Sequence, residues 1–141
     1  MRITIRPMDA KLVHAMTVQA AQNGGHPMSI ETLRDLAAVT PSYMALDGDE
    51  VLAAAGMIEL WAGRAFAWST LAPNLGHRII PIHRAVLRFL NSCDFRRVEM
   101  LVAVGHAEGV RWAEMLGFER EGRMRSALPA GGDAWMYARV R

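Results

Sequence analysis

The fold is decided by residues 65–104, AFAWSTLAPNLGHRIIPIHRAVLRFLNSCDFRRVEMLVAV. Residues 65–71 are typical of a strand, and residues 97–104 form a strongly apolar strand of the kind that is covered on both faces. Between them apolar side chains recur at helical spacing, and Pro81 suits the first helical position because no N–H is lost there. Such a strand–helix–strand unit is expected to be parallel, with a right-handed crossover.

The flanking segments add helices and antiparallel strands. Before this unit, the pattern predicts a strand, two helices and a hairpin at residues 3–6, 10–22, 30–39, 43–46 and 51–60. After it, a helix and two strands are predicted at residues 107–116, 118–125 and 134–140. The order β-α-α-β-β-β-α-β-α-β-β indicates an α/β fold with one mixed, mostly antiparallel sheet and helices on both faces.

Caps and turns supply finer expectations. Asp9 and Ser29 are expected to cap the first two helices. The inward positions of these helices are then Leu12, Val13, Met16 and Ala20 in the first, and Ile30, Leu33, Leu36 and Ala37 in the second. Asn23-Gly24-Gly25 is expected to end the first helix, and Gly56 indicates a bulge or a close backbone approach.

The composition favours one compact domain, residues 1–141. The chain is 52% hydrophobic and 21% charged, and no run of 18 apolar residues marks a membrane span. A single cysteine, Cys93, and the lack of an apolar signal core at the N-terminus favour the cytoplasm. The net charge is only +2, and carboxylates interleave with the arginines of the last two strands, so nucleic acid is not an expected partner.

Several motifs resemble the GNAT superfamily of acyl-coenzyme A-dependent N-acetyltransferases. The most family-like piece is LGFEREG at residues 116–122, within AEGVRWAEMLGFEREGRMR at residues 107–125. The family-like stretches ITIRPMDA, LAP and GGDAWMYARV follow the same order along the chain. The last of these also resembles GNAT-like proteins carried by bacteriophages and prophages.

The resemblance implies a place for acetyl-CoA. In the family, pantetheine pairs with the backbone of the fourth strand, which here places it at Leu71 and Ala72. The pyrophosphate rests on N–H groups at the next helix start, after a motif that would begin at Gly76. Ile79 and Pro81 occupy the motif's small positions, so His77 and Arg78 are the side chains expected to face the phosphates instead.

The catalytic groups of the family have no clear counterparts. His106 takes the place of an Asn that lies near the cofactor, and Ala113 takes that of the tyrosine that protonates the leaving thiolate. Residues 62–75 contain no carboxylate to act as a general base, and the nearest acids, Glu59 and Glu99, have the pattern of ordinary surface charges. The catalytic residues therefore stay unassigned, and no metal site is expected.

Two functions follow from the sequence. The first is an acetyl-CoA-dependent acetyltransferase acting on an amine of a small molecule or a protein. The second is a GNAT-fold phage structural or host-interaction protein whose cofactor loop has degenerated. The resemblance also allows a homodimer, for which no residue of the sequence gives a sign.

Overall fold

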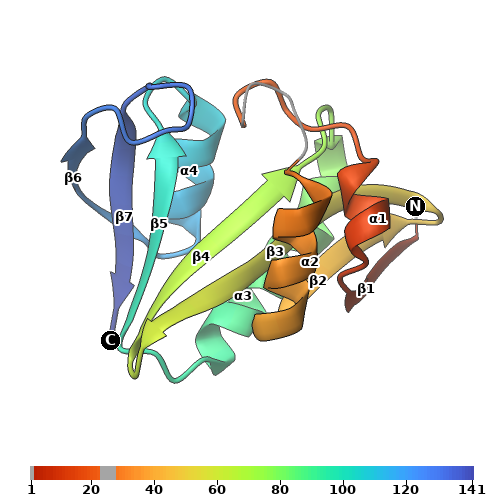
Figure 1. Ribbon diagram of the computed structural model, residues 1–141, viewed down its shortest axis with the longest axis horizontal. Helices are drawn as coiled ribbons and strands as arrows, with labels where there is room; N and C mark the ends of the chain where they lie inside the picture. The colour runs from red at the N-terminus through yellow and green to blue at the C-terminus, as the bar shows by residue number, and fades with distance from the viewer. Residues whose placement is uncertain (1, 23–27) are drawn as a thin grey trace. The chain divides into compact units, whose positions relative to one another are not determined.

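The computed structural model describes residues 2–22 and 28–141 (Figure 1). The elements are β1 (Ile3–Pro7), α1 (Ala10–His14), α2 (Ile30–Val39), β2 (Ser42–Asp47), β3 (Glu50–Trp61), β4 (Arg64–Leu71), the 3₁₀ helix η2 (Gly76–Arg78), α3 (Ile79–Ser92), β5 (Arg97–Ala103), α4 (Ala107–Met115), β6 (Glu119–Met124) and β7 (Ala134–Val140). The predicted order is confirmed. The strand order β1-β2-β3-β4-β5-β7-β6 confirms the predicted α/β class with a mixed, mostly antiparallel sheet.

The chain divides into two compact units, and the division falls within strands β3 and β4. The first comprises Met1–Ile58 and Trp68–Ser92, and the second comprises Glu59–Ala67 and Cys93–Arg141. In the first unit, α1 and α2 lie in front of β2 and β3 in the view of Figure 1, and α3 lies behind them. The prediction of a single domain over residues 1–141 stays a prediction.

Helix α2 forms as its caps predict. The Ser29 hydroxyl accepts from the N–H of Thr32, and the helix ends at Thr40, before Pro41. Leu33 and Leu36 are buried, as expected from their spacing. Ala37 is exposed, so its predicted inward position is wrong.

Helix α1 is shorter than the pattern predicts. Asp9 caps it as expected, but the helix ends at His14 and Lys11 lies exposed on it. Leu12 is exposed, contrary to the prediction, whereas Val13 is buried. After the helix, Gln19 and Gln22 bond to residues 69–72 at the end of β4, as described below. The stop predicted at Asn23-Gly24-Gly25 lies outside the described residues.

The hairpin of β2 and β3 is antiparallel, as predicted, and its close contact lies at Gly56. A Cβ atom there would stand 2.7 Å from the Ser42 hydroxyl, 2.9 Å from the Pro41 carbonyl oxygen and 2.9 Å from the Trp68 indole nitrogen. Only glycine leaves room for that approach, whereas the register shift of this hairpin lies between Ala45 and Leu46.

Helix α3 begins two residues before the predicted start. Pro81 was expected at the first helical position, but the helix starts at Ile79 because η2 runs directly into it. Pro81 is still within the first turn, where a missing N–H interrupts no helical bond. Ile82 and Leu90 are its buried residues, and Arg84 and Arg88 are exposed as expected.

The second unit is built on β5, which pairs with two neighbours. It runs parallel to β4 through the pairs Arg64–Arg97, Ala65–Val98 and Phe66–Glu99, as the strand–helix–strand unit predicts. It is antiparallel to β7, which also pairs with β6. Helix α4 ends with Gly117 in the left-handed region at φ +90, the predicted glycine cap.

Candidate functional site

The end of β4 is held by two glutamines from the segment after α1. Gln22 donates through Nε2 to the Ser69 carbonyl oxygen at 3.4 Å and accepts at Oε1 from the Leu71 N–H at 2.7 Å. Gln19 donates its backbone N–H to the Leu71 carbonyl oxygen at 2.8 Å and its side-chain Nε2 to the Ala72 carbonyl oxygen at 3.2 Å. Two of the predicted cofactor residues, Leu71 and Ala72, are therefore already bonded within the chain.

These bonds involve the edge of β4 that faces away from β3. The Ala72 N–H donates to the Leu52 carbonyl oxygen of β3 at 2.8 Å. Because backbone groups alternate in direction along an extended strand, those of Leu71 and Ser69 point to the opposite side. Side-chain and loop groups of residues 19–22 occupy this stretch of edge. Sequence patterns gave no sign of either glutamine, since both lay within a predicted helix.

The predicted phosphate residues form the turn between β4 and α3. Gly76 adopts a left-handed conformation at φ +57, and His77 is exposed in η2. Arg78 turns toward the β2–β3 hairpin and forms ion pairs with Asp47 at 3.3 Å and Glu50 at 3.0 Å. These three predicted residues are thus adjacent, but the Arg78 guanidinium is bonded to carboxylates.

Electrostatics at Arg78 follow from those ion pairs. The hydrogen bond to Glu50, and then that to Asp47, raises the pKa of Arg78. The pKa of Asp47 is lowered, mainly by the backbone N–H of Arg2 and also by Arg78. A single cation is thus matched by two anions, so an anionic ligand would have to compete with both carboxylates.

Two N–H groups at the start of α3 are bonded within the chain. The N–H of Arg78 donates to the Leu75 carbonyl oxygen at 3.1 Å, and that of Ile79 donates to the carbonyl oxygens of Gly76 and His77. Pro81 has no N–H. At the two positions where the sequence departs from the family motif, Ile79 thus has an N–H that is bonded to η2 and Pro81 has no N–H.

In the second unit, His106 occupies the turn between β5 and α4. It is the N-cap residue of α4, although its side chain makes no capping hydrogen bond. A Cβ atom on Gly109 would stand 2.6 Å from its Nδ1 atom, so the ring lies directly over that glycine. The ring is half-buried and fills the space that a side chain at residue 109 would need, and the role of His106 near a cofactor stays a prediction.

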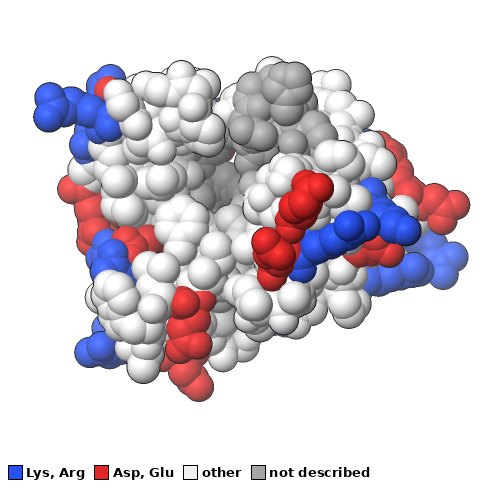
Figure 2. All heavy atoms as spheres, in the orientation of Figure 1, with Lys and Arg blue, Asp and Glu red and all other residues white. Residues whose placement is uncertain are grey.

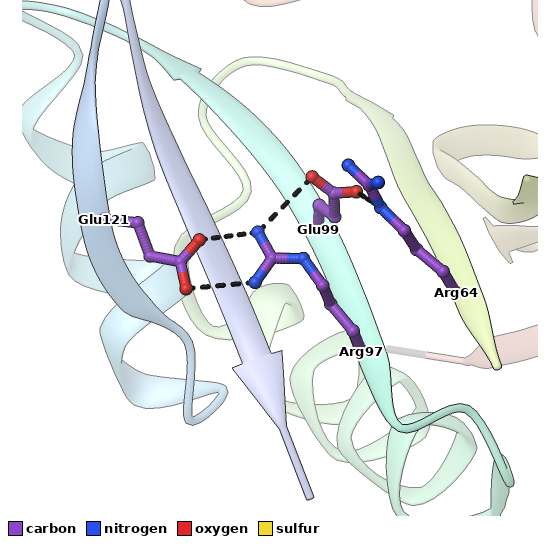
Figure 3. A network of polar contacts seen from close by, with 4 residues as sticks. All are labelled: Arg64, Arg97, Glu99 and Glu121. Atoms are coloured by element: carbon purple, nitrogen blue, oxygen red, sulfur yellow. Dashed lines mark hydrogen bonds and ion pairs between the residues drawn. The ribbon is translucent and has the colours of Figure 1, made fainter.

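The buried Glu99 lies at the centre of an ionic network on β4, β5 and β6, whose other members are partly exposed (Figure 3). Its side chain is 3% exposed and bonds to Arg64 and, at 3.4 Å, to Arg97. Arg97 also forms a paired contact with Glu121, at 2.5 and 3.0 Å. The expectation that Glu99 is a surface charge is wrong, because its side chain is buried beside Arg64 and Arg97.

The network fixes the protonation state of Glu99. The hydrogen bond from Arg64, followed by the charges of Arg64 and Arg97, lowers the pKa of Glu99 despite its burial. A carboxylate held in this way is a weak proton acceptor, so Glu99 serves the structure of the sheet and is a poor candidate for a general base.

A second polar cluster surrounds Tyr137, which sequence reasoning did not single out. This fully buried tyrosine accepts from Arg120 at 3.0 and 3.1 Å and donates to Glu114 of α4 at 3.1 Å. Arg120 also lies 4.0 Å from the ring centroid of Trp135. The antiparallel register of β6 with β7 places Arg120 opposite Tyr137. Ala113, at the position of the family tyrosine, is fully buried.

Charges of both signs alternate beside β6 and β7 (Figure 2). Arg123 pairs with Asp133 at 2.9 Å, as Arg97 does with Glu121. Within residues 2–22 and 28–141, no group of three or more His, Cys, Asp or Glu side chains could hold a metal ion. No helix in this part of the chain is long and apolar enough to cross a bilayer.

Comparison with solved structures identifies the fold. The chain is similar to the ribosomal-protein-S18-alanine N-acetyltransferase from Escherichia coli, with a TM-score of 0.77 and 15% identity over 99% of this chain and 94% of that one. It is also similar to a GNAT superfamily phosphinothricin acetyltransferase from Sinorhizobium meliloti in complex with AcCoA, with a TM-score of 0.72 and 20% identity over 99% and 89% of the two chains.

A third similar structure is a chimeric spermidine N-acetyltransferase from Vibrio cholerae, with a TM-score of 0.75 and 17% identity over 98% of this chain and 95% of that one. No protein-family model and no curated protein matches the sequence. The fold is therefore that of the GNAT acetyltransferases, as the sequence motifs predicted. At these identities the likeness defines the fold, and the activity has to be argued from the site.

Proposed function

We propose that the chain is an N-acetyltransferase that moves the acetyl group of acetyl-CoA to an amine. The observation that carries the proposal is the end of β4. There, the Ser69 carbonyl and the Leu71 N–H point away from β3 and bond to an amide side chain, Gln22. An edge that accepts one amide in this way can accept another, and the pantetheine arm of acetyl-CoA contains two.

In the proposed reaction a neutral amine attacks the thioester carbonyl, an N–C bond forms, and the C–S bond breaks as coenzyme A leaves as a thiolate. The attacking nitrogen releases one proton to water, so that the products are a neutral amide and the thiolate. The chain would contribute mainly by positioning, through the backbone of Leu71 and Ala72 beside pantetheine. His77 and Arg78 would face the pyrophosphate, Arg78 exchanging its carboxylate partners for phosphate. His106 would lie near the cofactor at the start of α4. The residues that move protons are not assigned.

The acceptor is proposed as an amine of a small molecule or a protein. Both kinds occur among acetyltransferases of this fold, since one similar structure is named for spermidine and another for a ribosomal protein. A cytoplasmic location, where acetyl-CoA is made, fits this proposal. A homodimer and a bacteriophage or prophage origin are carried over from the family resemblance alone.

The start of α3 supports a second candidate, a GNAT-fold phage structural or host-interaction protein without catalysis. Arg78 is bonded to Asp47 and Glu50, and the N–H of Ile79 is bonded within η2. Pro81 has no donor to offer. At three positions of this helix start, Arg78, Ile79 and Pro81, no N–H is therefore offered to a pyrophosphate.

Ligand binding separates the two candidates. Acetyl-CoA and coenzyme A are titrated by calorimetry, and the melting temperature is recorded with each. An acetyltransferase should bind both, and a ligand at 100 times its Kd should stabilise the fold by about 2.7 kcal/mol. Absence of binding and of any melting shift at millimolar acetyl-CoA would remove the enzyme proposal and leave the scaffold.

A further inference from the structure

We propose that the Gln22 carboxamide is a placeholder for the two amides of the pantetheine arm, so that this side chain sets the affinity of the chain for coenzyme A. The inference rests on the proposed function and assigns a role to a residue outside the family motifs. Its basis is the geometry at Ser69 and Leu71, in which one side-chain amide bonds to both backbone groups.

The carboxamide copies the bonding of one residue of an added strand, whose N–H and C=O belong to two successive peptide groups. An added strand places a donor against a carbonyl and an acceptor against an N–H of the same residue or of residues two apart. Gln22 does so with Nε2 against Ser69 and Oε1 against Leu71. A turn fixes its position, because the Gln22 N–H donates to the Gln19 carbonyl oxygen at 3.0 Å.

Neighbouring groups differ in how readily a ligand can replace them. The Leu71 carbonyl is bonded to the main chain at Gln19, so it is occupied while the segment keeps its path. The Gln22 amide is neutral, only half-buried, and can leave by rotation of its side chain. A ligand that brings the N–H of one amide and the carbonyl oxygen of a second restores the same two hydrogen bonds, so the exchange leaves no buried polar group unpaired.

The ligand must therefore carry a donor and an acceptor on the same side. Because a trans secondary amide points its N–H and its carbonyl oxygen in opposite directions, the two amides of pantetheine supply these groups together: the N–H of one faces Ser69 and the carbonyl oxygen of the other faces Leu71. The nucleotide half of coenzyme A, adenosine 3′,5′-bisphosphate, has no amide and would not compete with Gln22. Coenzyme A and pantetheine should thus respond to a change at residue 22, whereas the bisphosphate should not.

The test uses the variants Gln22→Ala and Gln22→Met with the full chain. Met keeps much of the length of glutamine but has neither its donor nor its acceptor. It therefore separates the loss of the two hydrogen bonds from any disturbance that the smaller Ala side chain causes in the segment. His14→Ala is the control, because it removes a 2.9 Å contact between the His14 ring and the Met28 carbonyl oxygen without touching β4. Calorimetry measures the Kd of coenzyme A, pantetheine and adenosine 3′,5′-bisphosphate for each protein.

If Gln22 occupies the edge nine tenths of the time, both variants should bind coenzyme A and pantetheine about tenfold more tightly. The bisphosphate should bind all four proteins alike, and His14→Ala should match the wild type for every ligand. Equal or weaker pantetheine and coenzyme A binding by the Gln22 variants would overturn this inference while leaving the proposed function standing. Absence of coenzyme A binding by every protein would overturn both.

Discussion

The two halves of β4 satisfy their polar groups in different ways. In the first half, Arg64 bonds to the buried Glu99, and the backbone pairs with β5 (Figure 3). In the second half, the backbone of Ser69 and Leu71 bonds to the neutral side chain of Gln22. Breaking the ion pair would leave a buried charge without its partner, whereas the hydrogen bonds to Gln22 can be replaced by equivalent bonds to a ligand. One strand thus combines a fixed anchor with a replaceable contact.

The largest effect is expected at the anchor. Glu99→Ala should lower the free energy of unfolding by about 3 kcal/mol, because it leaves two arginines beside a buried gap without their shared carboxylate. Denaturant unfolding measures the change. Glu121→Ala is the matched control, because it removes the second carboxylate that pairs with Arg97. The Glu121 side chain is 42% exposed, so its loss should change stability much less. Equal losses in the two variants would contradict the anchor role of Glu99.

Acid should weaken the same anchor. The pKa of Glu99 is lowered in the folded state, so its contribution is complete above its ordinary value of 4.5 and is lost as pH falls through the folded value. Melting temperatures of the wild type should therefore drop more steeply below pH 4.5 than those of Glu99→Gln, which has no carboxyl group to protonate. Parallel pH profiles for the two proteins would show that Glu99 is not the group responsible.

At the replaceable contact, stability should change less. Gln22→Ala should cost about 1 kcal/mol in free energy of unfolding, because two neutral hydrogen bonds at a half-buried position are exchanged for bonds to water. Thermal unfolding without ligand measures it. A loss as large as that of Glu99→Ala would mean that Gln22 is part of the core structure and is not exchangeable.

The smallest effect is expected at Arg78. Removing one competing carboxylate with Glu50→Gln should tighten coenzyme A binding by about two- to threefold, because the pair is largely exposed. Glu31→Gln, an exposed acidic residue of α2 without a contact to Arg78, serves as the control for net charge. Calorimetry at low and high salt measures both. An unchanged affinity in Glu50→Gln would remove Arg78 from the phosphate site.

The order of elements could be predicted because each element carries its own signals in the sequence. Ser29 and Gly117 mark helix ends locally, and the apolar periods distinguish strands from helices. The length of α1 could not be predicted, since its end depends on bonds from Gln19 and Gln22 to a strand about fifty residues later. Local patterns hold no information about such partners.

The turn from β4 into α3 lies where the motifs place it, and its role as a cofactor site stays a prediction. The partners of Arg78 could not be predicted, because they come from a hairpin roughly thirty residues earlier. Glu99 could have been recognised as buried, because it lies within a strongly apolar strand. A buried carboxylate needs a partner, and Arg64 lies two residues from Phe66, which pairs with Glu99 across the two strands.

The exposed Lys11 on α1 has a practical consequence for finding the acceptor. It is the only lysine among the sixteen lysine and arginine residues of positions 1–141, so the proposed reaction, turned on a lysine of this stretch, would mark this one side chain. In a mixture of candidate proteins incubated with labelled acetyl-CoA, lysine self-acetylation within residues 1–141 would thus fall on one known peptide. Acetylated lysines in peptides of the other proteins would point to a substrate.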